Sequence, residues 1–234
     1  MNAIVLFLRR IVFGHKATSD HYIEFLRSKG ARIGNNVKIY SPNQTHIDEQ
    51  FPFMLSIGDN VNITSGVQIL NHDYSWSVIK KKAGMVLGAV DSVEIGNNVF
   101  IGVGAIILMG SKIGDNCIIG AGSIVRGTIP SNSVAAGNPA KVICSLDTYT
   151  DKRMSKQYDE AANLVRCYRK SFGKNPPKEQ LPAYFFLFEP RANMNNPVFL
   201  SRLRLTGNYA DSLRVFESST PLFDNYTDFL NSVQ

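Results

Sequence analysis

The stretch from Ile95 to Pro130 reads IGNNVF, IGVGAI, ILMGSK, IGDNCI, IGAGSI and VRGTIP, which is six units of six residues. Every unit opens with Ile or Val. Glycine holds the second place in four of the units, at Gly96, Gly102, Gly114 and Gly120. The fifth place is held by Val99, Ala105, Ser111, Cys117, Ser123 and, less typically, Ile129. An amphipathic helix repeats every three to four residues and a half-buried strand every two, so a period of six predicts short strands that bend at regular corners.

A unit of this kind cannot bury its aliphatic side chains alone, but it can when it stacks on its neighbours. Three units would close one triangular coil, with coils about 4.8 Å apart. Glycine and asparagine at the corners would accept the positive φ that other residues resist. The same frame begins earlier in the chain, at Ile33, Ile39, Ile57, Ile63 and Ile69. We therefore expect a mainly β fold of roughly five stacked coils.

This pattern resembles the hexapeptide-repeat acyltransferases, and most closely the branch that acetylates sugars and polysaccharides. The resemblance covers residues 33–143 and includes the closing phrase GNPAKVI. It implies a left-handed parallel β-helix, which is an exception to the right-handed crossover rule. It also implies acetyl-CoA as the acyl donor, a carbohydrate acceptor, and a homotrimer with its active sites at the subunit interfaces.

Two segments depart from the six-residue frame. Residues 45–56 keep the spacing but lose the pattern, which predicts an irregular coil or bulge. From Ile69 to Ile95 the interval is 26 residues, which is not a multiple of six. If AVDSVE, from Ala89, is a degenerate unit, the surplus is residues 75–88, with the only Trp and three consecutive lysines. A loop of this length inside a repeat array is usually functional or disordered.

The segments on either side of the repeat read as helical, which divides the chain into residues 1–30, 31–143 and 144–234. Near the N-terminus, Ile23, Phe25 and Leu26 fall on apolar helical positions and Gly30 is a stop signal. After the repeat, Thr150 or Asp151 could cap a helix that ends at Gly173, with an apolar stripe of Met154, Tyr158, Ala161, Val165, Tyr168 and Phe172. The remaining residues read as short helices joined by turns.

The net charge of +6 favours an acidic partner: a phosphorylated cofactor, an anionic membrane surface or nucleic acid. No nucleic-acid-binding signature accompanies the charge, so nucleic acid is the least favoured of the three. The apolar run Ala3 to Leu8 is too short to span a bilayer. We expect it to begin a helix that packs on the coil, with peripheral membrane contact as the alternative. Three widely spaced cysteines without CxxC fit a reducing compartment, and we expect a cytoplasmic protein with Cys117 packed in the core.

His72 is the candidate catalytic residue. It is fourth in the unit that opens at Ile69, near a corner and directly before the extruded loop. Its position resembles that of the catalytic histidine of the family. An imidazole that titrates near neutrality can take the proton of a sugar hydroxyl as that hydroxyl attacks a thioester. The alternative is a corner histidine that makes surface hydrogen bonds.

Asp73 follows in the fifth place, where the other units carry small or aliphatic residues. A carboxylate in an inward position is costly unless it is paired. Asp73 could orient the ring of His72, as carboxylates do for catalytic imidazoles. The wall of the coil could equally open at this unit so that Asp73 faces solvent. Asp91 is a rival for the orienting role, and His46 has a weaker claim to catalysis.

The resemblance also implies a groove for the pantetheine arm along the later coils. Residues that match the family's phrases along this groove are Phe100, where many relatives have Trp, Val103, Ala121, Arg126 and Lys141. Arg126 and Lys141 would meet the CoA phosphates. For each residue the alternative is a role in the fold or an ordinary solvated charge.

These observations favour an O-acetyltransferase that acts on a sugar or a surface-polysaccharide precursor. N-acetylation of an amino-sugar or an antibiotic is the second enzymatic possibility, and a non-catalytic β-helix scaffold is the third. The four histidines are scattered, so a metal site is not expected. No G-x-S-x-G, P-loop or dinucleotide motif is present to support a covalent acyl-enzyme, ATP use or hydride transfer.

Overall fold

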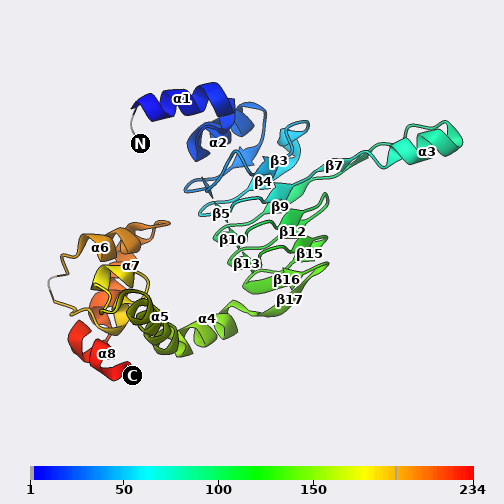
Figure 1. Ribbon diagram of the computed structural model, residues 1–234. Helices are drawn as coiled ribbons and strands as arrows, with labels where there is room; N and C mark the ends of the chain where they lie inside the picture. The colour runs from blue at the N-terminus through cyan, green and yellow to red at the C-terminus, as the bar shows by residue number, and fades with distance from the viewer. Residues whose placement is uncertain (1–2, 193) are drawn as a thin grey trace. The chain divides into compact units, whose positions relative to one another are not determined.

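The computed structural model describes residues 3–192 and 194–234. The chain forms two compact units, Met1–Tyr149 and Thr150–Gln234, each with its own hydrophobic core. The first unit contains the repeats and the second is helical (Figure 1).

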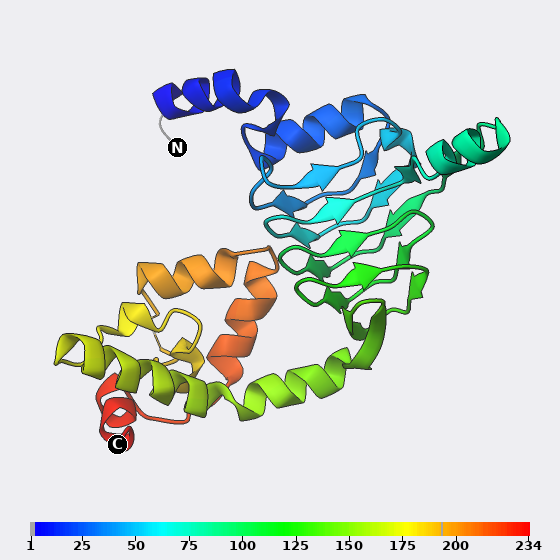
Figure 2. The same cartoon turned by 45° about the vertical axis from the view of Figure 1, so that its right-hand side comes forward.

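Three parallel sheets, which we call A, B and C, form the walls of the first unit (Figure 1, Figure 2). Sheet A contains β1 (Arg32–Ile33), β4 (Leu55–Ile57), β9 (Val93–Ile95), β12 (Lys112–Ile113) and β15 (Thr128–Ile129). Sheet B contains β2 (Lys38–Ile39), β5 (Asn62–Ile63), β10 (Val99–Ile101), β13 (Cys117–Ile119), β16 (Ser133–Gly137) and the antiparallel β17 (Ala140–Ser145). Sheet C contains β3 (His46–Ile47), β6 (Gln68–Ile69), β11 (Ile106–Ile107) and β14 (Ile124–Val125). The chain visits A, B and C in turn, which is the predicted β-helix.

The first residue of each unit forms the core of the coil. In sheet A, Ile57 pairs with Ile95 and Ile95 with Ile113, and each of these residues is 3% exposed. Ile113 then pairs with Ile129, a fifth-place residue that is also 3% exposed. The small residues of the fifth place are buried as well, which confirms that Cys117 packs in the core at 1% exposure. Removing these aliphatic columns from water is the main favourable term for the stack.

Glycine and asparagine serve different purposes at the corners. Positive φ occurs at Asn36, Asn60, Asn98, Asn116 and Asn132. Neighbouring asparagines also bond through their side chains, as from Asn98 Nδ2 to Asn116 Oδ1 at 2.8 Å. Corner glycines such as Gly104 and Gly122 also have positive φ, as expected, whereas the glycines of the second place have ordinary φ and are needed because coils approach closely there. A Cβ on Gly102 would lie 2.5 Å from the backbone nitrogen of Ala121.

The extra residues between Ile69 and Ile95 form an arm. Strands β7 (His72–Asp73) and β8 (Ala89–Val90) pair antiparallel as its stem, and helix α3 (Trp76–Ala83) lies at its tip (Figure 1). The segment therefore leaves the coil as predicted, but it contains a helix. The proposed unit AVDSVE is wrong in its first half, because Ala89 and Val90 belong to the stem and the coil resumes only at Val93.

The irregular segment near residues 45–56 is shorter than expected. His46 and Ile47 form the regular strand β3, which pairs with β6. The irregularity is the 3-10 turn η2 (Pro52–Met54), which precedes β4.

The N-terminal segment contains α1 (Ala3–Phe13), the 3-10 turn η1 (Gly14–Lys16) and α2 (Ser19–Ser28). Helix α2 packs on the coil through Tyr22, Ile23 and Leu26, which belong to its core. The prediction that the first helix packs on the coil is wrong for α1, which has no buried residue. Within the described ranges no helix is both long and apolar enough to cross a membrane.

The second unit is built around aromatic side chains. Its elements, with α4 crossing the boundary, are α4 (Leu146–Ser155), α5 (Gln157–Phe172), η3 (Lys178–Gln180), η4 (Phe185–Leu187), α6 (Pro197–Arg204), α7 (Tyr209–Ser218) and α8 (Tyr226–Ser232). The fully buried phenylalanines are Phe188, Phe199, Phe216 and Phe229. The helix predicted from Thr150 begins earlier, at Leu146, and is interrupted at Lys156. It ends at Gly173 as expected, but Met154 and Phe172 are exposed rather than part of the buried stripe.

Candidate active site

The candidate site lies where the chain leaves sheet C for the arm. Strand β6 ends at Ile69, and Asn71 is buried at the corner that follows. The side-chain amide of Asn71 donates to the carbonyl of Phe51 at 2.7 Å, and its backbone N–H donates to Asp48 Oδ2 at 3.3 Å. These bonds fix the chain at the point where the next residue, His72, begins the stem.

His72 is held by a buried carboxylate. Its Nδ1 contacts Oδ2 of Asp48, whose side chain is only 4% exposed against 20% for His72. Asp48 Oδ1 accepts a second bond from the backbone N–H of Gln50 at 2.9 Å. A carboxylate accepts but does not donate, so this contact assigns the proton to Nδ1 and leaves Nε2 as the basic nitrogen.

Two aromatic rings flank the imidazole. Phe51 and Tyr74 stand edge-on to His72, with ring centroids 5.4 and 5.3 Å away and interplanar angles of 89° and 80°. The hydroxyl of Tyr74 donates to Gln50 Oε1 at 3.1 Å, which ties the arm to the coil. The carboxylate and the two rings together restrict the rotation of the imidazole.

The structure pairs His72 with Asp48, and neither Asp73 nor Asp91 takes that place among the described contacts. Asp73 is exposed and accepts from the backbone N–H of Ser75 at 2.8 Å. The hydrogen bonds from Ser75 lower the pKa of the Asp73 carboxyl. Asp91 is also exposed, and its Oδ1 accepts from the N–H of Ser92 at 2.7 Å. The wall opens at this unit, which was the alternative interpretation of Asp73.

His72 borders two pockets. One, of about 280 Å³, lies against the coil and is lined by Leu70, His72, Asp73, Leu108, Met109 and Arg126. The other, of about 130 Å³, lies along the stem and is lined by Gln50, Phe51, His72, Asp73, Tyr74, Trp76, Gly88, Ala89 and Val90. We call them the coil pocket and the stem pocket. The imidazole is thus within reach of molecules bound on either side.

Arg126 lies at the same corner as His72. The residues that follow β6, β11 and β14 stack there, with Leu70 N–H bonded to Ile107 O and Leu108 N–H to Val125 O. Arg126 therefore lies two strand spacings below the level of Leu70, or about 10 Å. Its exposed guanidinium helps to line the coil pocket.

The other predicted cofactor residues lie elsewhere on the coil. Val103 and Ala121 stack at the opposite edge of sheet C, where Gly122 N–H donates to Val103 O at 2.8 Å. Phe100 projects from β10 and is 43% exposed, and Lys141 is exposed on β17. A single chain thus brings Val103 close to Ala121, and Arg126 close to His72, but it does not gather all five residues.

Asp48 and the aromatic pair Phe51 and Tyr74 were missed by sequence reasoning. The sequence did contain a signal for Asp48, since it is an acidic residue one coil before His72. It was hidden because η2 shifts the register: Ile47 pairs with Ile69, whereas three units of six would have paired it with Ser65.

The sequence matches known proteins over the repeat region. Residues 92–127 match the family described as bacterial transferase hexapeptide (six repeats). Protein CapG of Staphylococcus aureus is 40% identical over 127 residues, which are 54% of this chain and 73% of that protein. The chain belongs to the hexapeptide-repeat transferase family. Galactoside O-acetyltransferase of Escherichia coli K12 is 35% identical over 146 residues, covering 62% of this chain and 68% of its own length.

Solved structures in this family include a maltose O-acetyltransferase from Clostridium difficile 630. It is 30% identical with a TM-score of 0.42, and the match covers 61% of this chain and 82% of that one. With membership of the family, the predicted left-handed parallel β-helix and the predicted enzyme class, acetyltransferase, are confirmed.

Proposed function

We propose that this acetyltransferase moves an acetyl group from acetyl-CoA to a hydroxyl of a sugar or polysaccharide precursor, with His72 as the general base. The observation that carries the proposal is the buried Asp48 carboxylate on Nδ1 of His72, beside two pockets that meet at the imidazole.

The pair His72 and Asp48 supplies the proton transfer. Nε2 of His72 takes the proton of the acceptor hydroxyl as its oxygen attacks the thioester carbonyl. The imidazolium that forms is stabilised by Asp48, and it returns the proton to the departing thiolate sulfur. The ring needs no reorientation between the two transfers, because Nδ1 stays bonded to the carboxylate throughout.

Features along sheet C suit acetyl-CoA, whose contribution is an acyl group activated as a thioester. The turns at Val103 and Ala121 each contain a glycine, Gly104 and Gly122, with positive φ. A Cβ added to either glycine would have no atom within 4 Å, so the backbone is accessible there. A thin pantetheine chain can approach backbone of this kind closely. At the other edge of the sheet, Arg126 offers a cation for a phosphate.

The stem pocket suits a carbohydrate. Its rings, from Phe51, Tyr74 and Trp76, provide apolar surface, and Gln50 and Asp73 add groups that can hold hydroxyls. Pockets that combine apolar walls with a few convergent polar groups are typical of small-molecule sites. The galactoside and maltose O-acetyltransferases among the similar proteins act on sugars by name, which supports the same acceptor class for this chain.

The enzyme is proposed to work as a homotrimer in which a neighbouring subunit completes the groove. Phe100 and Val103 support this assembly, because they are 43% and 57% exposed on the wall where the second side of the groove would lie. Light scattering of the purified chain tests the assembly, and a monomeric mass would contradict it.

The experiment is the release of thiol from acetyl-CoA with a panel of sugars, nucleotide-sugars and amino-sugars. Release that depends on a sugar and disappears in His72→Ala is expected, and mass spectrometry of the product should find an acetyl ester. An amide product would instead assign the enzyme to N-acetylation. Failure to bind acetyl-CoA and to release thiol with any acceptor would leave a scaffold as the function.

A further inference from the structure

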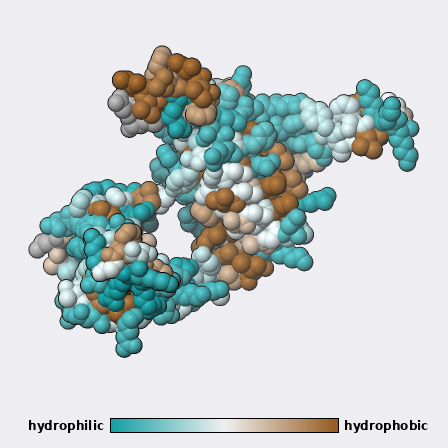
Figure 3. Space-filling view, in the orientation of Figure 1, coloured by the Kyte–Doolittle hydropathy of each residue, from teal (hydrophilic) through white to brown (hydrophobic). Residues whose placement is uncertain are grey.

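Helix α1 is the most apolar exposed element of the first unit. Six exposed apolar side chains share one side of it: Ile4 (67%), Val5 (47%), Phe7 (64%), Leu8 (55%), Ile11 (67%) and Val12 (69%). Phe13, at 37%, and the half-buried Leu6 lie on the other side of the helix. Figure 3 shows the resulting apolar surface over this helix. Burial of such side chains is worth about 1.5–3 kcal/mol each, so a helix of this kind is expected to have a partner that covers it.

The apolar side chains form a broad sector that arginines flank. At about 100° per residue, the six side chains span an arc of about 160° around the helix axis. Arg9 lies just beyond one edge of this arc and Arg10 beyond the other. A broad apolar face with basic residues along its borders is the pattern of helices that lie in the plane of a membrane interface.

The charged side chains of α1 itself, Arg9 and Arg10, have one sign. Residues 3–19 contain Arg9, Arg10 and Lys16 but no Asp or Glu. Arg9 Nε is held by the carbonyl of Ala17 at 2.9 Å, which keeps its guanidinium beside the helix. Cationic side chains at the edge of an apolar face meet lipid phosphates when that face is buried in a bilayer.

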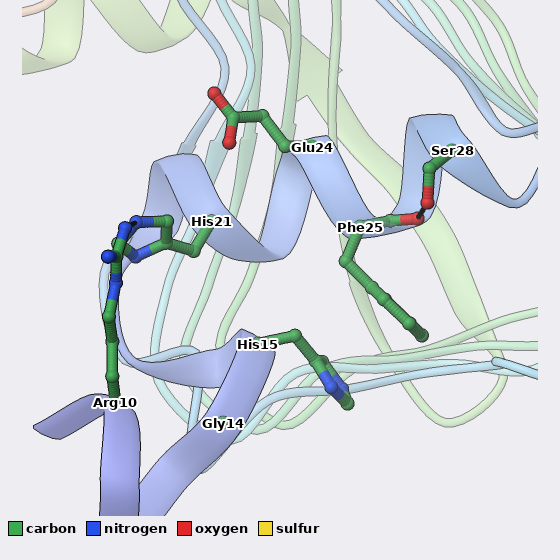
Figure 4. Close-up of a pocket in the computed structure, with 7 residues that line it drawn as sticks. All are labelled: Arg10, Gly14, His15, His21, Glu24, Phe25 and Ser28. Atoms are coloured by element: carbon green, nitrogen blue, oxygen red, sulfur yellow. Dashed lines mark hydrogen bonds between the residues drawn. The ribbon is translucent and has the colours of Figure 1, made fainter.

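A hollow lies at the C-terminal end of α1 and is bordered by Arg10. It has a volume of about 480 Å³ and is lined by Arg10, Gly14, His15, His21, Glu24, Phe25 and Ser28. Figure 4 shows Arg10 of α1 and His21 of α2 facing one another across its edge, with His15 nearby. Arg10 and Glu24 are the charged residues of this lining, so the hollow adds no net charge to that of α1.

From these observations we infer that α1 docks the enzyme on the surface of an anionic lipid bilayer, with its apolar side chains among the acyl chains and Arg9 and Arg10 at the headgroups. The helix has 11 residues and a length of about 16 Å, so it lies on the surface and does not span the bilayer. A bilayer fits better than a second copy of α1, because residues 3–19 contain no Asp or Glu that could pair with the arginines of a copy, whereas anionic headgroups can.

The test is sedimentation of the full chain with vesicles of phosphatidylcholine alone or mixed with phosphatidylglycerol. The chain should bind the anionic vesicles more tightly. Phe7→Glu with Ile11→Glu should weaken binding about tenfold for each apolar side chain lost. Arg9→Gln with Arg10→Gln should weaken binding to anionic vesicles about fivefold for each arginine and leave binding to neutral vesicles unchanged.

Matched controls use exposed residues of the second unit. Val215→Glu with Leu222→Glu, and Lys170→Gln with Lys174→Gln, should bind vesicles like the wild-type chain. Equal loss of binding in these controls, or no wild-type binding to either vesicle, would overturn the proposal. An absence of vesicle binding together with a lower oligomeric mass of the Phe7/Ile11 variant would identify a second copy as the partner. Thiol release with a soluble acceptor should persist in all four variants, so this test fails or succeeds independently of the acetyltransferase assignment.

Discussion

The regular coils and the corner at His72 are made from the same short strands, but different interactions hold them. In the coils, aliphatic residues stack on one another and asparagines repeat the same bond from level to level, as from Asn116 to Asn132 at 3.0 Å. At the corner, the backbone amide of Asn71 and the imidazole of His72 both bond to the buried carboxylate of Asp48, and aromatic rings flank the imidazole. Each bond in the coils is one of many equivalent bonds, whereas the bonds at the corner orient a single ring, the imidazole of His72.

The largest effect is expected at the imidazole itself. His72→Ala should lower kcat by roughly 10² to 10⁴-fold, which is the usual contribution of a general base. Acetyl-CoA affinity, measured by calorimetry, and the midpoint of urea unfolding should stay near the wild-type values. If turnover persists at the wild-type rate, His72 is not the general base and the bonds that orient it do not serve catalysis.

Replacing the buried carboxylate should have a smaller effect on the same step. Asp48→Asn keeps the volume but removes the charge that stabilises the imidazolium, and we expect kcat to fall roughly tenfold to 100-fold. The pH dependence of kcat should also change in Asp48→Asn, which a purely structural role of Asp48 would not produce. Asp91→Asn is the matched control, because Asp91 is an exposed carboxylate at the base of the arm that makes no contact with His72 among those described, and its kcat should be unchanged. An equal loss in both variants would argue against the pairing of His72 with Asp48.

In the coils, the sharpest test is a single methyl group. Gly102→Ala places a Cβ 2.5 Å from the backbone of Ala121, which cannot move without shifting the next coil. The free energy of unfolding should fall by about 1–3 kcal/mol in urea titrations. Gly88→Ala, where a Cβ meets no atom within 4 Å, should change it by less than about 0.5 kcal/mol. Equal stability of both variants would mean that the coils are not closely stacked at Gly102.

The smallest effect separates backbone conformation from side-chain bonding at one asparagine. Asn116 has φ 56° and bonds to both Asn98 and Asn132. Asn116→Gly loses the bonds but keeps the conformation, whereas Asn116→Ala loses both. The alanine variant should be less stable than the glycine variant by about 1–2 kcal/mol. A more stable alanine variant would show that the positive φ is not required at this corner.

The fold could be predicted because the period of six is itself a consequence of stacking. Each Ile in the first place of a unit is buried against the same place one coil away, so the pattern in the sequence repeats the contacts in space. The site could be predicted only in part, since His72 follows from the end of a unit but its partner Asp48 comes from the coil before. The turn η2 changes the register between them, and no spacing rule reveals that shift.

The ends of the chain show a different limit. The sequence predicts helical structure for residues 1–30 and for a helix from Thr150 or Asp151 to Gly173, and helices α1, α2, α4 and α5 are found in these segments. It does not tell what an apolar face contacts. Val165 is buried in its own unit, whereas Phe7 is exposed, although both are apolar residues of helical segments.

The stem of the arm returns the chain to sheet A in register with the preceding coil. Val93 and Ile95 pair with Leu55 and Ile57 in the same register that the rest of sheet A keeps, and Asp91 N–H bonds back to Asn71 O at 3.0 Å. The free-energy cost of lengthening a segment between two fixed points rises slowly, by about 0.6 kcal/mol for each doubling. The segment between Asp73 and Ala89 can therefore change in length while the stem and the repeats keep their register.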